Sequence, residues 1–143
     1  MNVNVMRPNL APPAHLELSL AVVGLDFPNA DKSNRRFEMA LCKAGDGVHL
    51  HLEPKNKADE RAVSVFSERG IQLGYVTAER CGMIGAKLAA GEEYVAIFQE
   101  VQPYAAIVRV RFGQGRPTLP APRAVAAANE DFFADPDGPQ WGA

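Results

Sequence analysis

The sequence lacks several features that would assign its cellular setting directly. Among its 143 residues there are only two cysteines, and no apolar run reaches the roughly 18 residues that a membrane-spanning helix requires. The first residues contain no basic segment followed by an apolar core, so we expect no secretory signal and a cytoplasmic location. In that compartment we expect Cys42 and Cys81 to be reduced and packed rather than joined in a disulfide.

Motifs of common enzyme classes are also missing. The chain contains no Gly-x-Ser-x-Gly element, no Gly-rich loop ending in Gly-Lys-Ser/Thr and no His-Glu-x-x-His element. His49 and His51 lie two residues apart, with Cys42 as the nearest soft ligand, but a zinc site needs three or four ligands. We therefore expect histidines that face solvent, no cofactor and no enzymatic activity.

The charge is low and unevenly distributed. A formal net charge of −2 argues against nucleic-acid binding through bulk electrostatics. Residues 32–61 nevertheless contain seven positive and five negative side chains, whereas residues 113–143 contain two arginines and four acids. Charge alone leaves two interpretations open: a weakly basic patch on the folded part, or a mixed solvated surface.

What the sequence does contain is a series of short stretches in which apolar and polar residues alternate. This period of two is typical of β-strands. It predicts strands over residues 16–24, 37–41, 48–53, 62–66, 71–75, 94–101 and 105–112. One helix is predicted over residues 78–90, because Thr77 suits the N-cap, Gly91 suits the C-terminal stop and apolar residues recur at helical spacing between them.

A chain of short strands must protect the edges of its sheet, and closure into a barrel does so. We predict a mainly β fold, a small barrel of about six strands with one helix and flexible termini. Residues 1–14 form a flexible arm in this prediction, residues 15–112 form the barrel domain, and residues 113–143 form a Pro- and Ala-rich linker or disordered tail. Phe132-Phe133 and Trp141 within the tail are a candidate docking segment.

The polar loop from Glu53 to Arg61 has the most distinctive chemistry. Asn56 and Asp59 have short side chains that often cap turns by bonding their own backbone, which is one interpretation. In the other, they present an amide and a carboxylate to a ligand while Lys55 and Lys57 supply positive charge. A carboxylate beside lysines suits a ligand that combines phosphate with a free hydroxyl, because the carboxylate accepts that hydrogen bond. The 3′-terminal nucleotide of a nucleic acid is such a ligand.

A second candidate element precedes this loop. Arg35 and Arg36 are followed by Phe37, so a guanidinium that can bind phosphate lies beside a ring on which a base can stack. Tyr75 and Phe98 are further candidate stacking residues. Taken singly, each aromatic residue is also compatible with a place in the core.

Together these motifs resemble the HIRAN domain family. The matching elements, in chain order, are Arg36-Phe37, the Gly-Asp-Gly-Val turn at 45–48, Leu52-Glu53-Pro54, Asn56, the stretch 59–65 and the stretch 70–76. The resemblance extends roughly from Leu18 to Phe112. It implies an OB-like β-barrel that binds single-stranded DNA, since the helicase-attached form of the family captures 3′-hydroxyl ends during replication-fork processing.

The resemblance also implies roles for individual residues. Asn56 and Asp59 would contact the terminal nucleotide, with Asp59 accepting a hydrogen bond from the 3′-hydroxyl. Arg36 and Phe37 would contact phosphate and stack on a base, and Tyr75 would take a phosphate-contacting position that usually holds His. The complete set expected to bind nucleic acid is Arg35, Arg36, Phe37, Lys55, Asn56, Asp59 and Tyr75.

Two residues depart from the family pattern, Tyr75, in the place of the usual His, and Glu38. The helicase-attached form has a second aromatic residue where this chain has Glu38, which predicts an anion near the path of the nucleic acid. The expected partners are single-stranded DNA and a helicase or other DNA-processing protein, with a role in DNA repair and no membrane. Two alternatives remain open: a protein-interaction module that recruits a partner through its tail, and a metal-dependent hydrolase that uses His49, His51 and Asp59.

Overall fold

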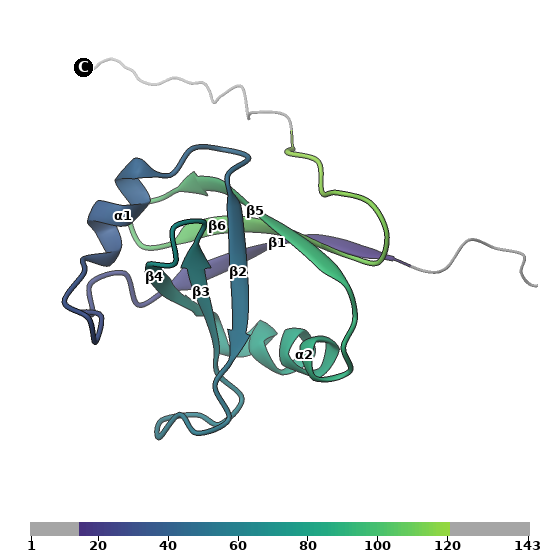
Figure 1. The fold of residues 1–143 in the computed structure, drawn as a ribbon, viewed down its shortest axis with the longest axis horizontal. Helices are drawn as coiled ribbons and strands as arrows, with labels where there is room; N and C mark the ends of the chain where they lie inside the picture. The colour runs from purple at the N-terminus through teal and green to yellow at the C-terminus, as the bar shows by residue number, and fades with distance from the viewer. Residues whose placement is uncertain (1–14, 121–143) are drawn as a thin grey trace, which may run out of the picture.

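The alternating stretches of the sequence form antiparallel strands that close into a barrel. The computed structural model describes residues 15–120. Its strands are β1 (Leu16–Val23), β2 (Gly47–Leu52), β3 (Val63–Ser67), β4 (Gln72–Val76), β5 (Tyr94–Val101) and β6 (Ala106–Phe112). They follow one another around the barrel in the order β1-β4-β3-β2-β5-β6 (Figure 1). The predicted mainly β, six-stranded barrel is confirmed.

The barrel interior is filled by the apolar half of each alternating strand. On β6, Ala106, Val108, Val110 and Phe112 are buried and the residues between them point outward. Strand β3 is covered on both faces. Because side chains occupy the interior, a ligand must bind on the outer surface or at the loops.

Residues 35–41 form a helix rather than the predicted strand. Helix α1 (Arg35–Leu41) begins at Asn34, whose side-chain oxygen accepts a hydrogen bond from the backbone N–H of Phe37 at 2.8 Å. Its buried residues are Arg35, Glu38 and Met39, which have the spacing of one helical face. The prediction was wrong because it followed the apolar residues alone, whereas two of the three buried residues here are charged.

Helix α2 (Ala78–Ala89) matches the predicted helix closely. Cys81 and Ile84 are buried on its inner face, and Gly91 has the positive φ of a helix stop. Its Gly85 allows a close approach to β2, since an added Cβ would lie 3.2 Å from Leu52.

In Figure 1, α2 lies below β2, whereas α1 lies beside β4 on the other side of the barrel. Residues 15–120 therefore contain two helices, one more than predicted. Neither helix of the described part is long and apolar enough to cross a membrane.

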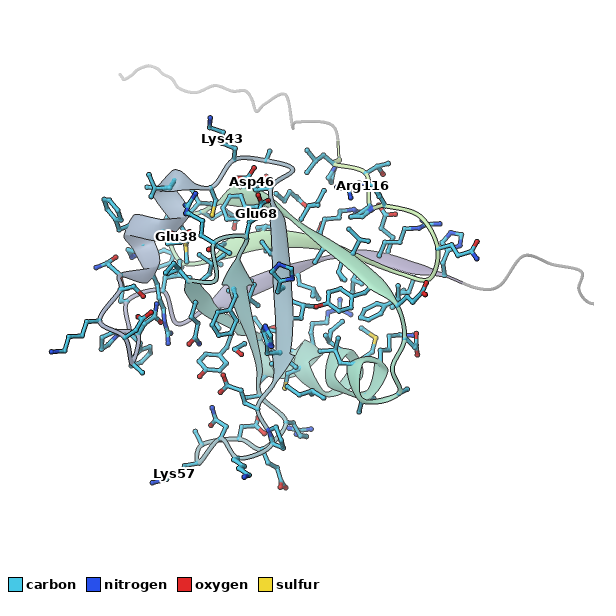
Figure 2. The ribbon with its side chains drawn as sticks, in the orientation of Figure 1. Glu38, Lys43, Asp46, Lys57, Glu68 and Arg116 are labelled. Atoms are coloured by element: carbon cyan, nitrogen blue, oxygen red, sulfur yellow. The ribbon has the colours of Figure 1, made fainter. Side chains whose placement is uncertain are left out.

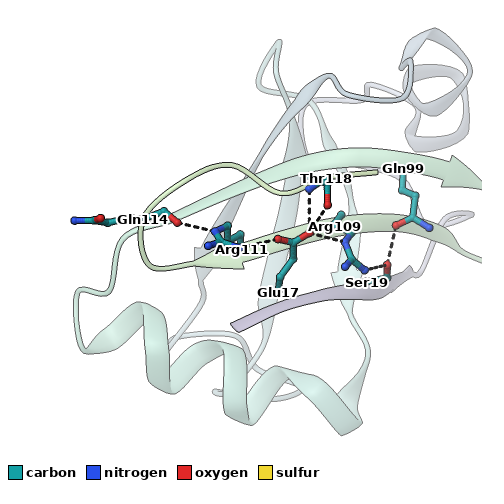
Figure 3. Close-up of polar contacts among 7 residues, drawn as sticks. All are labelled: Glu17, Ser19, Gln99, Arg109, Arg111, Gln114 and Thr118. Carbon is teal, nitrogen blue, oxygen red and sulfur yellow. Dashed lines mark hydrogen bonds and ion pairs between the residues drawn. The ribbon is translucent and has the colours of Figure 1, made fainter. Parts of the chain in front are cut away.

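The segment after β6 remains in contact with the barrel. Residues 113–120 turn back along β1, where Thr118 donates to Glu17 through its backbone N–H at 2.9 Å and its hydroxyl at 3.2 Å. The same carboxylate accepts from Arg109 and Arg111 of β6 (Figure 3). Residues 1–14 and 121–143, with Phe132-Phe133 and Trp141, lie outside the described residues. The division into arm, domain and tail therefore stays a prediction.

Candidate nucleic-acid interface

The polar loop is organised by Glu53, which follows the last residue of β2. Its Oε1 accepts a hydrogen bond from Asn56 Nδ2 at 2.9 Å and another from the Tyr75 hydroxyl at 3.0 Å. Glu53 thereby joins two residues that the sequence placed in the site but did not place together. We call the cluster of Arg35, Glu53, Asn56, Asp59 and Tyr75 the loop site.

Glu53 remains ionised within this cluster. Burial is the largest single influence and acts to raise the pKa of Glu53. Hydrogen bonds from Asn56, Ser64 and Tyr75, together with the nearby Arg35 charge, outweigh it and hold that pKa below its ordinary value. A carboxylate surrounded by donors fixes the loop. Because the Tyr75 hydroxyl donates its hydrogen bond to Glu53, it is not free to donate to a phosphate.

Asn56 and Asp59 cap the turns of their own loop. Asn56 Oδ1 accepts from the backbone N–H of Ala58 at 2.8 Å and of Asp59 at 3.1 Å. Asp59 Oδ1 accepts from the backbone N–H of Arg61 at 2.8 Å. The turn-capping interpretation is thus confirmed, and it leaves Asp59 Oδ2 with only a weak 4.0 Å contact from Cys81 Sγ. That oxygen is the acceptor this loop can offer to a ligand.

Arg35 lies inside the protein, unlike the neighbouring arginine. Its side chain donates to Asn29 Oδ1 at 2.6 Å and to the carbonyl of Gly24 at 2.7 Å, and its guanidinium lies 5.6 Å from the centre of the Tyr75 ring. The residue is only 6% exposed. Arg35 therefore connects the loop after β1 to β4 and positions Tyr75 rather than facing a ligand.

Arg36 lies on a more exposed side of α1, and exposed aromatic residues adjoin in the chain both Arg36 itself and the two residues that it contacts. It pairs with Asp26 and donates to the carbonyl of Pro103 at 3.1 Å. Phe27 follows Asp26, Phe37 follows Arg36 and Tyr104 follows Pro103. These three rings belong to residues that are 68%, 67% and 87% exposed. We call these three residues, Phe27, Phe37 and Tyr104, the aromatic surface.

Two members of this surface were not predicted from the sequence. Phe27 and Tyr104 each lie beside a proline in a connection between elements, Phe27-Pro28 and Pro103-Tyr104. A turn cannot bury a large ring as readily as a strand can, and this was the available signal. Phe98, which the sequence analysis considered for stacking, is instead buried in the core.

A small pocket adjoins the aromatic surface. It measures about 230 Å³ and lies between the loop after β1 and the start of α1. Leu25, Phe27 and Pro28 provide apolar walls, Lys32 provides positive charge, and Arg36 is paired there with Asp26. A planar group that carries a negative charge fits this combination of lining residues.

Glu38 is not on the surface where the sequence analysis placed it. It is 5% exposed, and its Oε2 lies 2.7 Å from Arg69 Nη2. Figure 2 shows it on the inner side of α1, near Asp46 and Glu68. The expected anion beside the nucleic-acid path is therefore wrong. Its charge acts locally instead: burial first, and then Glu38, raise the pKa of the Cys42 thiol to about 11.

The remaining candidates are exposed. Lys55 and Lys57 extend from the tip of the loop into solvent, as Figure 2 shows for Lys57. His49 and His51 face outward from β2, as predicted. Between residues 15 and 120, no group of three or more His, Cys, Asp or Glu side chains could hold a metal ion. The set of His49, His51 and Asp59 is therefore not assembled.

Comparison with known proteins agrees with this architecture. The sequence model of the HIRAN domain family matches residues 17–111. The crystal structure of the HIRAN domain of human HLTF is 18% identical, with a TM-score of 0.55 over 67% of this chain and 74% of that chain. A crystal structure of a Lactobacillus plantarum protein is 20% identical, with a TM-score of 0.58 over 69% of this chain and 95% of that one. No curated protein sequence matches significantly.

Proposed function

Because the chain belongs to the HIRAN domain family, we propose that its barrel binds single-stranded DNA and prefers ends with a free 3′-hydroxyl. The observation that carries the proposal is the aromatic surface: three exposed aromatic residues, each adjoining in the chain either Arg36 or a residue that the Arg36 guanidinium contacts. Bases stack on such rings with little sequence preference, and a guanidinium beside them binds the connecting phosphate. In this role the domain would serve DNA repair or fork processing together with a helicase or other DNA-processing protein.

Arg36 can exchange its present partner for a phosphate. Its pairing with Asp26 lies at the surface, and exposed ion pairs contribute little free energy, roughly 0 to 1 kcal/mol. A phosphodiester offers the same bidentate geometry and the same single negative charge as the Asp26 carboxylate that it would replace. The contact with Pro103 would hold the guanidinium in place during the exchange.

The loop site supplies the feature that would distinguish a terminus from an internal nucleotide. Asp59 Oδ2 is a carboxylate oxygen that is not used by the loop backbone, and Lys55 and Lys57 lie nearby in sequence. A terminal 3′-hydroxyl can donate to this oxygen, whereas a 3′-phosphate would be repelled by it. Arg35, Glu53 and Tyr75 hold the loop in position, so the acceptor is preorganised.

The proposal is tested with two oligonucleotides that differ only at the 3′ end. We expect the free hydroxyl to bind about tenfold more tightly than the 3′-phosphate, since hydrogen bonds to charged groups contribute about 1.5 to 3 kcal/mol. Asp59→Asn keeps the acceptor that caps Arg61 but removes the charge, and it should abolish the preference. Glu60→Gln, at the exposed neighbouring position, is the matched control and should preserve it. Equal affinities for both ends in the unmodified protein would contradict end recognition.

A further inference from the structure

We propose that residues 130–137 of the same chain dock on the aromatic surface and compete there with nucleic acid. The competition rests on the proposed function, whereas the docking does not. The segment is Glu-Asp-Phe-Phe-Ala-Asp-Pro-Asp, in which two adjacent phenyl rings are flanked by four carboxylates. It lies outside the described residues, so the occupant is inferred from the surface and from the reach of the chain.

The chemistry of the segment complements that of the surface. Phe132 and Phe133 provide rings that can pack against Phe27, Phe37 and Tyr104, all of which are largely open to solvent among residues 15–120. The flanking carboxylates match the positive charge of Lys32 in the adjoining pocket, and one of them can replace Asp26 as the partner of Arg36. Rings with anions on either side present the same groups as a short nucleic acid, in which bases alternate with phosphates.

The path of residues 113–120 places the start of the tail within reach. Strand β6 ends at Phe112, which pairs with Tyr94 at the end of the hairpin far from Tyr104. The chain does not leave the barrel there, because Gly113 bonds to the carbonyl of Glu93 and Thr118 bonds to Glu17 (Figure 3). The tail therefore starts alongside β1, about 20 Å from the β5–β6 turn at roughly 3.3 Å per strand residue.

The length of the intervening chain fits this distance. Eleven residues lie between Pro120 and Phe132, and a random-coil chain with these twelve Cα–Cα steps has an r.m.s. span of about 19 Å and a maximum reach of about 40 Å. A linker whose r.m.s. span matches the distance between two sites gives a local concentration in the millimolar range, on the order of 1 mM. Even a weak contact between the segment and the surface is then substantially occupied within one molecule.

Docking is tested on the full-length chain without nucleic acid. The variant Phe132→Ser/Phe133→Ser removes both rings, and Val125→Ser is the matched control, since it removes an apolar tail residue outside the segment. We expect the double variant to shift the backbone amide NMR signals of Phe37 and Tyr104, and the control to leave them unchanged. Adding Phe37→Ser should remove most of the effect that the double variant has at Tyr104.

Three results would overturn the docking. They are unchanged signals at the aromatic surface, shifts confined to another region such as the pocket beside Lys87 and Phe112, and shifts that disappear on dilution. The last result would make a second copy the occupant rather than the same chain.

Binding of the hydroxyl-ended oligonucleotide then tests the competition, and the double variant should bind about threefold more tightly than the unmodified chain and the control. Docking without DNA binding by any form would contradict the proposed function alone, and DNA binding without docking would contradict only this inference.

Discussion

The side of the barrel around Glu17 and the aromatic surface around Arg36 use arginine in opposite ways. At Glu17, one carboxylate accepts from Arg109, Arg111 and Thr118, and these groups hold the segment after β6 against the barrel (Figure 3). At the aromatic surface, Arg36 has one exposed anionic partner and the neighbouring rings face solvent. Where several donors already share one carboxylate, the arginines stabilise the fold, whereas a guanidinium with a weak partner among open rings remains available for a ligand.

The two adjacent arginines of α1 repeat this contrast one residue apart. Arg35 is buried and its partners are Asn29, Gly24 and the ring of Tyr75, whereas Arg36 is directed toward the surface. Consecutive residues of a helix differ in direction by about 100°, so one arginine lies inside and the next lies outside. The pair therefore offers a matched comparison of structure and recognition.

The largest effect is expected from Arg35→Met. This change leaves the buried Asn29 side chain and the Gly24 carbonyl without their donor, so we expect the free energy of unfolding to fall by about 3 kcal/mol. Arg36→Met should change it by less than about 1 kcal/mol, because its ion pair is exposed. Urea unfolding followed by fluorescence measures both, and equal losses in the two variants would remove the distinction between them.

A smaller and pH-dependent effect is expected from Glu17→Gln. The backbone N–H of Thr118 is the main cause that lowers the pKa of Glu17 to about 2, with further contributions from Arg111 and Arg109 against the opposing effect of burial. A lowered pKa stabilises the fold above the unfolded-state value of about 4.5, and this stabilisation is lost as the pH falls toward 2. We expect the variant to lose about 2 kcal/mol at pH 7 after allowance for partial exposure.

The pH dependence provides the control for Glu17→Gln. The difference in unfolding midpoint between the unmodified protein and the variant should be constant from pH 7 to about 5 and should shrink toward pH 2. A difference that stayed constant down to pH 2 would show that packing, rather than the carboxylate charge, links Glu17 to Thr118.

At the aromatic surface, we expect substitutions to change DNA binding more than they change the free energy of unfolding. Phe37→Ser should weaken binding of a short single-stranded oligonucleotide about tenfold, since stacking on one ring contributes roughly 1 to 3 kcal/mol. Its free energy of unfolding should change by less than about 0.5 kcal/mol, because the ring is exposed. Met83→Ser, at an exposed apolar position on α2, is the control and should leave binding unchanged. Similar losses in both variants would indicate nonspecific apolar contact.

The smallest effect concerns salt. Few cations face the candidate interface, so the logarithm of the binding constant should fall only gently with the logarithm of the salt concentration. Arg36→Met should make that slope shallower by about 0.7, the value for one phosphate contact on a single strand. Arg80→Met changes an exposed residue of α2 and should leave the slope unaltered. Titration by fluorescence anisotropy at several salt concentrations measures the slope. An unchanged slope for Arg36→Met would show that Arg36 does not contact a phosphate.

Residues 35–41 show where sequence reasoning succeeded and where it stopped. The Arg-Phe pair is correctly placed at the surface, yet its secondary structure was wrong because Phe37, Met39 and Leu41 mimic a strand. Asn34, which caps the helix, was the signal for the right answer. Within the loop site, only the capping by Asn56 and Asp59 was predictable, because these two side chains interact with residues close to them in sequence.

The sequence by itself determined the strands of the barrel, the second helix and the capped loop. Each of these follows from periodicity or from bonds between near neighbours, which depend on a few consecutive residues. Only the tertiary structure decided that Glu38 turns inward to Arg69, that Arg35 is buried while Arg36 is not, and that Phe27 and Tyr104 join Phe37. The exposure of these side chains depends on partners that are distant in the chain, and barrel closure brings those partners together.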